Sequence, residues 1–233
     1  MKLLSIVIPA YNEERFLGAL LERIRAVDLT PLDVSKEIIV VDDCSRDRTA
    51  EIARGVPDVI LERHQVNGGK GKAVRTGIAR AQGDLVIIQD ADLEYEPQDY
   101  IPMLRALLSG QGDVVYGSRY LDRGLLQKYE HQSWTAYLGG RSLSLIALVL
   151  TGRYLTDTVT ALKLFSRSAL STLDLQTTGF ELDHEITAKM LARGHHIVEV
   201  PIRYFPRSRQ EGKKIGLRDW FIATRTFWRF RKG

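Results

Sequence analysis

The sequence predicts an α/β protein whose centre is a doubly wound, mostly parallel β-sheet. Short apolar runs alternate with helix-like segments through the first half of the chain. Each run is bounded by polar residues, which is typical of strands that are buried on both faces. The chain has 233 residues, 44% of them hydrophobic and 27% charged, which suits one globular domain or one domain with an extension.

The strands and helices are expected to alternate along the chain. A first strand at residues 3–8 leads to a helix for which Asn12 is a good N-cap and which runs to about Val27. The later strands are expected at 37–41, 59–61, 84–88 and 114–116, and the helices between them at 47–53, 73–81 and 97–108. Parallel strands joined in this way bring their carboxyl ends to one edge of the sheet, where ligands bind in open α/β sheets.

An acidic segment, Gln89-Asp90-Ala91-Asp92-Leu93-Glu94, follows the buried run 84–88. If its backbone stays extended, Asp90, Asp92 and Glu94 point to the same face. Three carboxylates on one face repel one another unless a cation lies among them, and oxygen ligands suit Mg²⁺ or Mn²⁺. The simpler alternative is a solvated acidic turn that caps the next helix. The buried strand before the segment and the polar residues at two further strand ends favour the metal.

Two of these polar features lie at other strand ends. Asp42 and Asp43 can accept hydrogen bonds from a base N–H or a ribose hydroxyl, and the glycine-rich loop 67–72 lets backbone N–H groups and Lys70 or Lys72 approach an anion. The loop is not a P-loop, because its spacing differs and no Lys-Ser/Thr pair follows. Each feature alone also fits a helix cap or a turn. Their order along one sheet edge points to a binding site.

The cysteine content, the length of the apolar runs and the net charge bear on where the protein works and what it binds. The single cysteine, Cys44, excludes an internal disulfide framework and suits a reducing compartment. The apolar run at the N-terminus is too short for a signal peptide and no small-residue cleavage site follows it, and no stretch is long enough to span a bilayer. The net charge is +4, with basic residues toward the C-terminus, which suits nucleic acid, anionic lipid or a phosphorylated substrate.

Two segments of the second half bear on membranes. Trp134–Leu150 is largely apolar, and we favour a buried helix that packs on the sheet over an interfacial helix that meets a lipid tail. Ile215–Lys232 interleaves aromatic and basic residues, as in helices that lie on an anionic membrane surface. RNA binding fits the same composition, but no nucleic-acid motif supports it. We therefore expect the main domain at 1–214 and an amphipathic C-terminal helical extension at 215–233.

Four motifs of the first half resemble those of family 2 glycosyltransferases with the GT-A fold. They are Ser5-Ile6-Val7-Ile8-Pro9-Ala10-Tyr11-Asn12-Glu13, Val40-Val41-Asp42-Asp43-Cys44-Ser45, Asn67-Gly68-Gly69-Lys70-Gly71 and Gln89-Asp90-Ala91-Asp92. The motifs of the second half resemble the dolichol-phosphate mannosyltransferase branch. They are Gly117-Ser118-Arg119, Asp157-x-x-Thr160-x-x-Lys163, 179–185, 200–204, and Arg207 with Glu211-Gly212-Lys213-Lys214. The resemblance covers nearly the whole chain.

The resemblance implies a metal-dependent, inverting enzyme whose main domain is catalytic. It would move mannose or glucose from GDP-mannose or UDP-glucose to dolichyl or undecaprenyl phosphate, with Mg²⁺ or Mn²⁺ as cofactor. The implied partners are the nucleotide-sugar, the polyprenyl phosphate, the membrane surface and a membrane protein, with no nucleic acid. The implied location is cytoplasmic, peripheral on the cytoplasmic face of the membrane.

The same motifs imply a role for individual residues, with Asp42 reading the base and Arg207 lying near the donor pyrophosphate. Glu94 stands where mannosyltransferases often have Gln. The residues expected to bind the nucleotide-sugar are Pro9, Ala10, Tyr11, Glu13, Asp42, Lys70, Asp90 and Lys213. The expected metal ligands are Asp90, Asp92 and Glu94. The expected acceptor-binding residues are Arg119 and Arg141, and the expected catalytic residues are Asp92, Arg119 and Arg207.

The chemistry leaves the acceptor open between a phosphate and a hydroxyl. Breaking the anomeric C–O bond leaves negative charge on the nucleoside diphosphate, which a divalent ion and an arginine stabilise. A phosphate acceptor is already an anion and needs arginines to hold it, whereas a hydroxyl needs a general base, for which Asp157 and Glu181 are candidates. The alternatives are therefore a transferase that acts on a glycan hydroxyl, a nucleotidyltransferase, and an inactive nucleotide-sugar-binding subunit.

Overall fold

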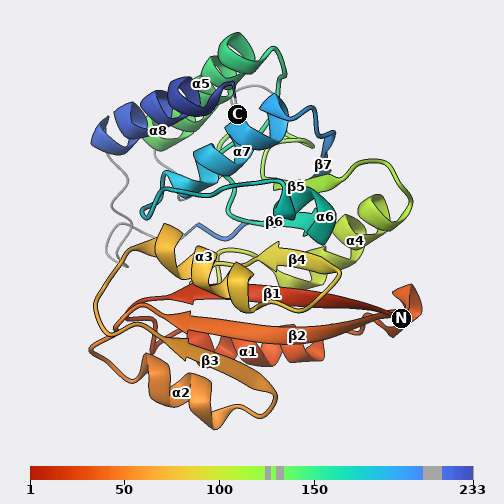
Figure 1. Cartoon of the computed structure of the whole chain (residues 1–233), viewed down its shortest axis with the longest axis vertical. Helices are drawn as coiled ribbons and strands as arrows, with labels where there is room; N and C mark the ends of the chain where they lie inside the picture. Colours follow the sequence, from red (N-terminus) through yellow and green to blue (C-terminus); the bar gives the residue numbers. More distant parts are fainter. Residues whose placement is uncertain (124–126, 130–133, 207–216, 233) are drawn as a thin grey trace.

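The computed structural model describes residues 1–123, 127–129, 134–206 and 217–232. They contain a seven-stranded sheet with the strand order β3-β2-β1-β4-β6-β5-β7 (Figure 1). The strands are β1 (Lys2–Ala10), β2 (Val34–Asp42), β3 (Val59–Arg63), β4 (Leu85–Ile88), β5 (Val114–Ser118), β6 (Lys163–Ser166) and β7 (Ile197–Pro201). β6 runs antiparallel to β4 and β5, and the other pairs are parallel. The predicted α/β class and mostly parallel sheet are confirmed.

Helices cover both faces of the sheet, because each central strand is apolar on both sides. Leu4, Ile6 and Ile8 of β1 pack against α1 (Leu17–Ala26), α2 (Thr49–Gly55) and α4 (Tyr100–Leu108). On the other face, Val7 lies in a second cluster with α3 (Lys70–Arg80), α6 (Arg167–Ser171) and α7 (Leu182–Ala192). Two short 3₁₀ helices, η1 (Thr30–Leu32) and η2 (Pro97–Asp99), complete these layers. The continuous apolar runs of the sequence are thus the middle layer of a sandwich.

Two long helices lie beyond the end of the sheet. These are α5 (Trp134–Thr151) and α8 (Leu217–Phe230), and both pack mainly on each other and on α7 (Figure 1). The expectation that the helix starting at Trp134 packs on the sheet is therefore wrong. The expected C-terminal helix is present, but one face of it is buried, since Phe227 and Phe230 lie in a core cluster with Ala147.

The first helix begins later than the sequence suggested. Asn12 has a φ of 55°, in the left-handed region, and does not cap α1, which begins at Leu17. The side-chain oxygen of Asn12 instead accepts from the Arg46 amide at 2.9 Å, and the Asn12 amide donates to Ser45 Oγ at 2.9 Å. The loops after β1 and β2 are therefore tied together at the carboxyl ends of these strands.

Candidate active site

The acidic segment turns away from the extended path that the sequence suggested. β4 ends at Ile88, and Leu93 has a φ of 60°, so alternate residues no longer share one face. Asp92 Oδ1 accepts from the amide of Glu94 at 3.2 Å. Within the described ranges, no three Asp, Glu, His or Cys side chains gather closely enough to hold a metal ion. The expected group of three carboxylates is therefore not formed.

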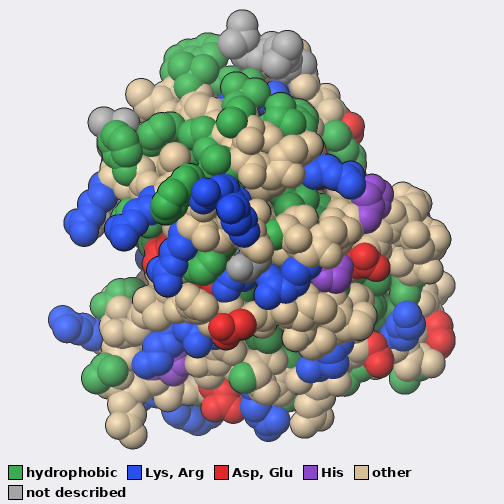
Figure 2. Space-filling model, turned by 45° about the horizontal axis from the view of Figure 1, so that its top comes forward, with side chains coloured by type: hydrophobic (Ala, Val, Ile, Leu, Met, Phe, Trp, Pro, Cys, Tyr) green, Lys and Arg blue, Asp and Glu red, His purple; other side chains and the backbone are tan. Residues whose placement is uncertain are grey.

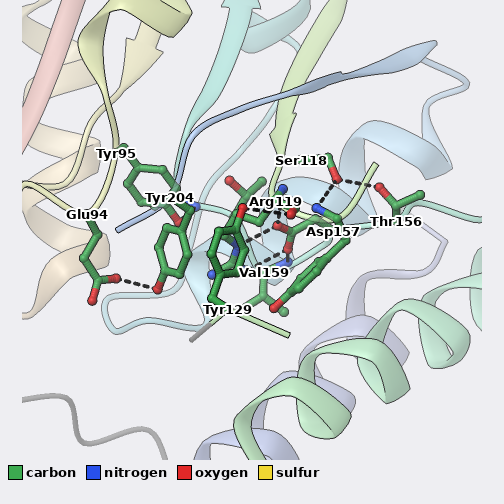
Figure 3. A network of polar contacts seen from close by, with 12 residues as sticks. Glu94, Tyr95, Ser118, Arg119, Tyr129, Thr156, Asp157, Val159 and Tyr204 are labelled. Atoms are coloured by element: carbon green, nitrogen blue, oxygen red, sulfur yellow. Dashed lines mark hydrogen bonds and ion pairs between the residues drawn. The ribbon is translucent and has the colours of Figure 1, made fainter. Parts of the chain in front are cut away.

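Glu94 has a structural role in this arrangement. Its side chain is buried, and the hydroxyl of Tyr204 donates to its Oε2 at 2.6 Å (Figure 3). Burial raises the pKa of Tyr204, so the hydroxyl keeps its proton and remains a donor. Glu94 thus anchors Tyr204 instead of facing the same way as Asp90 and Asp92. The prediction that it shares their face is wrong, because it assumed an extended backbone through Leu93.

Lys70 provides a cation beside Asp90. It is the first residue of α3, and its Nζ lies 2.7 Å from Asp90 Oδ1 and 3.4 Å from Asp183 Oδ2. Asp183 also pairs with the fully buried Lys163 at 3.0 Å. Burial opposes the charge on Asp183, but Lys163 and Lys70 outweigh it and hold its pKa at about 2. Two carboxylates and two ammonium groups thus form one charge-balanced cluster, which we call the Lys70 cluster.

The glycine-rich loop is held by Asp43. The Asp43 carboxylate accepts from the amides of Gly68 at 2.8 Å and Gly69 at 2.7 Å, and it pairs with His64 Nδ1 at 2.6 Å. Gly69 has a φ of 89°, and a Cβ atom at this position would lie 2.5 Å from the Thr178 carbonyl oxygen. Glycine is therefore required here by backbone conformation and by close packing. The loop fixes the start of α3, and with it Lys70.

We expect Asp43→Ala to loosen this loop. Gly68 and Gly69 each lose a charged acceptor, which lowers the free energy of local opening by roughly 1.5–3 kcal/mol. Native-state hydrogen exchange at these two amides measures the change. A matched control is Asp47→Ala, which removes a carboxylate that accepts from the amides of Glu14 and Thr49. Equal protection of Gly68 and Gly69 in the wild type and in Asp43→Ala would contradict the anchoring role.

The residues expected in the nucleotide pocket lie together at the ends of β1 and β2. Ala10 is the register partner of Asp42, Pro9 and Ala10 are buried, and Tyr11 is 43% exposed. Asp42 is fully buried, and its carboxylate accepts from Arg63 Nε at 3.0 Å and from the Ser45 amide at 3.1 Å. Arg63 is half exposed, so it is the member of this pair that a ligand can reach.

The amide of Glu13 donates to Thr49 Oγ1 at 2.8 Å, which adds to the ties between these two strand ends. Arg207 and Lys213 were also expected to contact the donor. Both lie outside the described residues, so the structure assigns neither of them a position.

Arg119 follows β5 at the same edge and is held in a buried ion pair. Its Nε and Nη2 donate to the two carboxylate oxygens of Asp157 at 2.6 and 2.7 Å (Figure 3). Glu199 accepts from the amides of Thr156 and Asp157 at 2.7 and 2.9 Å and so fixes the loop that carries Asp157. The pair uses two of the three guanidinium nitrogens. It fixes the plane of the Arg119 guanidinium, and Nη1 takes no part in the pair with Asp157.

Arg141 of α5 lies beside the same loop. Its Nη1 donates to the Thr156 carbonyl at 3.0 Å, and its guanidinium carbon lies 5.7 Å from the centre of the Tyr120 ring. The Arg119 guanidinium carbon lies 5.5 Å from the same ring. The two arginines expected to face the acceptor are therefore brought together around Tyr120, although 22 positions separate them in the sequence, from 119 to 141.

Tyrosines connect these arginines to the acidic segment. Tyr204, anchored by Glu94, lies 4.9 Å from the Arg119 guanidinium carbon and 5.5 Å from the ring of Tyr95. Burial raises the pKa of Tyr95, and the charges of Arg119, Asp90 and Asp157 all act on it. Tyr95 is thus influenced by the charge of Arg119 and by that of Asp90 in the Lys70 cluster. Tyr95 therefore connects the Lys70 cluster to Arg119 within one candidate site.

The candidate general bases differ in how they are engaged. Asp157 is committed to Arg119 and accepts further bonds from the backbone of Arg119 and Val159. Glu181 Oε1 accepts from the Gly179 amide at 3.3 Å. Burial lowers the pKa of His184 to about 4, so its ring is neutral at physiological pH. Deprotonation of a hydroxyl by Asp157 would first require breaking its buried ion pair.

Sequence reasoning missed several of these residues. His64, Arg63, Asp183, Lys163 and Tyr95 support the site but were not among the expected site residues. Lys163 and Asp183 did lie in quoted motifs, and a lysine inside an apolar run is itself a signal, because a buried lysine needs a partner. Arg63 is the last residue of β3 and His64 follows it, at the carboxyl edge of the sheet where ligand-binding side chains are expected.

Comparison with known proteins identifies the family. The profile of glycosyl transferase family 2 matches residues 5–174, which include most of β1, all of β2 to β6 and the carboxyl ends of β1 to β5. The chain belongs to this family. It is accordingly a glycosyltransferase, and its sheet and helices form the GT-A fold.

Named relatives add detail about the branch. The dolichol-phosphate mannosyltransferase of Pyrococcus furiosus is 32% identical over 91% of this chain and 59% of its own length. The UDP-N-acetylglucosamine–dolichyl-phosphate N-acetylglucosaminyltransferase of Methanococcus voltae is 28% identical over 87% of this chain and 85% of its own. Several other relatives are longer, and the chain spans between 48% and 63% of them.

Among solved structures, the glucosyl-3-phosphoglycerate synthase of Mycobacterium tuberculosis has a TM-score of 0.71 at 20% identity. The match covers 96% of this chain and 76% of the synthase, which was crystallised with Mn²⁺, UDP and its product. The same synthase was also crystallised with Mg²⁺ and UDP. At this level of identity the likeness supports the fold, and the ligands are those of the synthase.

Proposed function

We propose that this glycosyltransferase moves a hexose from a nucleotide-sugar to the phosphate of a polyprenyl phosphate at a membrane surface. The observation that carries the proposal is the pair of arginines around Tyr120. Arg119 of this pair also lies 4.9 Å from the ring of Tyr204, which Glu94 of the acidic segment anchors. Relatives named for dolichyl-phosphate acceptors support the same acceptor class. GDP-mannose and UDP-glucose both remain candidate donors.

Arg119 and Arg141 would hold the acceptor phosphate. Arginine presents a planar fork of donors that fits phosphate oxygens, and Asp157 fixes the plane of the Arg119 fork. The acceptor is already an anion, so one of its oxygens attacks the anomeric carbon without a base. The C–O bond to the nucleoside diphosphate breaks, and that bond's electron pair leaves with the diphosphate. Attack from the face opposite the leaving group inverts the anomeric centre.

The donor set at the acidic segment fits a divalent cation. Mg²⁺ in such sites is commonly held by one or two carboxylates together with substrate phosphates, so Asp90 and Asp92 suffice without Glu94. Lys70 Nζ lies 2.7 Å from Asp90 Oδ1, so the ion would replace this ammonium at the carboxylate. When bound, the ion would stabilise the charge that develops on the leaving diphosphate. Asp90 and Asp92 would hold this ion beside the diphosphate.

The paired helices α5 and α8 would supply the membrane surface. An apolar hollow of about 640 Å³ lies between them, with Leu145, Val149, Phe221 and Trp228 in its lining. These four side chains are between 56% and 82% exposed. Figure 2 shows hydrophobic side chains gathered over this part of the molecule, close to Lys and Arg side chains. None of the described helices has the length and apolar character needed to cross a bilayer.

The basic residues of α8 suit anionic lipid, and its exposed apolar face suits the headgroup boundary. We therefore expect the protein to bind anionic vesicles at low salt and to release them as salt rises. Val149→Asp should weaken this binding roughly tenfold, because it removes an exposed valine that would contact the lipid and adds a negative charge, which anionic lipid repels. Sedimentation with vesicles measures the bound fraction.

The matched control is Val66→Asp, at a valine that is 66% exposed but lies in the loop after β3, away from α5 and α8. It should leave vesicle binding near the wild-type value. A protein that stays in the supernatant at low salt, or two valine variants that behave alike, would contradict a membrane role for this surface.

Transfer itself is tested with a panel of radiolabelled nucleotide-sugars and a short-chain polyprenyl phosphate. We expect one hexose donor to give a labelled, acid-labile lipid product. If every donor fails to react while a nucleotide-sugar binds, the chain is a binding subunit instead of an enzyme acting on this lipid.

A further inference from the structure

The Lys70 cluster places an ammonium group at the carboxylate where the proposed function requires a divalent cation. The acidic segment needs a cation when the donor diphosphate is bound, yet the protein already places one there. Lys70 Nζ lies 2.7 Å from Asp90 Oδ1, and the Lys70 side chain is only 14% exposed. An ammonium group and a divalent cation cannot both lie against the same carboxylate oxygen, because like charges at this separation repel strongly.

On the basis of the proposed function, we propose that Lys70 is an internal counter-ion of Asp90 which moves to the donor diphosphate and so couples donor binding to metal binding. In the free enzyme, Lys70 neutralises Asp90 and opposes a divalent cation. When the diphosphate enters, its oxygens take the ammonium, and Asp90 becomes free to bind the cation. The two ligands then strengthen each other's binding, and by linkage the effect is equal in both directions.

The backbone of Lys70 is fixed while its side chain can move. Gly69 and Gly71 pack closely on the backbone of Thr178 and Gly179, and the Lys72 amide donates to the Thr178 carbonyl at 3.1 Å. The start of α3 is therefore held in place. The lysine side chain has four rotatable bonds, so its ammonium can pass between neighbouring anions without any shift of the helix.

Lys70 can leave Asp183 without leaving a buried carboxylate unpaired, because Lys163 remains beside it. Asp183 lies 3.4 Å from Lys70 Nζ and also pairs with the buried Lys163 at 3.0 Å, so it stays neutralised when Lys70 moves. The ring of Phe180, 67% exposed, lies 5.8 Å from Lys70 Nζ, which places the ammonium close to the molecular surface. The free cluster has no net charge, and a divalent cation added alone would leave it positive. Adding the diphosphate restores the balance.

The test measures Mn²⁺ affinity without nucleotide, from the electron paramagnetic resonance signal of free Mn²⁺. Lys70→Gln removes the charge but keeps a donor for Asp90 and Asp183, and it should tighten Mn²⁺ binding roughly five- to hundredfold. Lys70→Arg keeps a cation and should stay close to the wild type. The matched control is Lys72→Gln, at an exposed lysine that forms no ion pair within the described residues.

A second arm measures UDP and GDP affinity by calorimetry in excess chelator, where Lys70→Gln should weaken binding of the diphosphate that the wild type accepts. Thermal unfolding verifies that each variant is folded, and Lys70→Met replaces Lys70→Gln if the latter does not fold. Unchanged or weaker Mn²⁺ binding in the folded variant would overturn the counter-ion role alone. A wild type that binds neither diphosphate nor Mn²⁺ would overturn the proposed function itself.

Discussion

The substitution Asp92→Asn is expected to lower the turnover number by roughly 10²- to 10³-fold. The physical reason is that the leaving diphosphate gains negative charge in the transition state, and a carboxylate that holds the cation there has no neutral substitute. The fold should survive, because Asp92 Oδ1 accepts from the Glu94 amide and a carboxamide oxygen can accept the same bond. Excess chelator should abolish transfer, and added Mg²⁺ or Mn²⁺ should restore it.

The control for this substitution lies at the other end of β4. Asp84 precedes β4, at the end opposite to the acidic segment, and its carboxylate accepts from the Leu3 amide at 3.0 Å. Asp84→Asn makes the same chemical change far from the site and should leave turnover near the wild-type value. Steady-state rates of the two variants are compared at saturating donor and acceptor. Full activity of Asp92→Asn, or of the wild type in excess chelator, would rule out the metal interpretation.

The second large effect is expected at Arg119. Arg119→Lys retains a positive charge against Asp157 but loses the planar fork, so kcat/KM for the acceptor should fall roughly ten- to hundredfold. Donor binding should change little. Arg119→Ala would in addition leave Asp157 buried without its partner, which destabilises a protein by roughly 3–5 kcal/mol. The lysine variant is therefore the informative one, and thermal unfolding separates the two effects.

A second arginine in the chain offers a matched control. Arg203 is also paired with a carboxylate, since its Nη2 and Nε both donate to Asp99 Oδ1, at 2.7 and 3.0 Å, but it is half exposed. Arg203→Lys should leave the acceptor kinetics unchanged. If Arg119→Lys also leaves the acceptor kinetics unchanged, Arg119 does not bind the acceptor phosphate. A hydroxyl acceptor with Glu181 as base then becomes the better account.

The sequence predicted the strands whose burial is visible in their own run of apolar residues. The five expected strands are present because continuous apolar runs such as 84–88 report burial on both faces. β6 was missed, since Lys163-Leu164-Phe165-Ser166 is short and begins with a lysine whose burial depends on Asp183, twenty positions later. A pairing of this kind leaves no trace in the local sequence pattern.

The candidate site was also predicted in part, where topology alone decides which residues meet. The ends of the parallel strands placed Asp42, Lys70 and Asp90 at one edge, as topology requires. The sequence could not reveal the positive φ of Leu93, which separates Glu94 from the other carboxylates. Nor could it reveal that Asp157, considered as a base, is bound to Arg119. Such details arise from packing between distant segments, here through Tyr204 and the loop that Glu199 fixes.

The central claim is that the acceptor is a phosphate and not a hydroxyl, and one measurement tests it directly. Transfer from the preferred nucleotide-sugar is followed for a short-chain polyprenyl phosphate and for the matching polyprenyl alcohol, at equal concentrations and with the same enzyme. The arginine pair predicts a glycosylated product from the phosphate and none above background from the alcohol. Equal transfer to the alcohol would contradict the account.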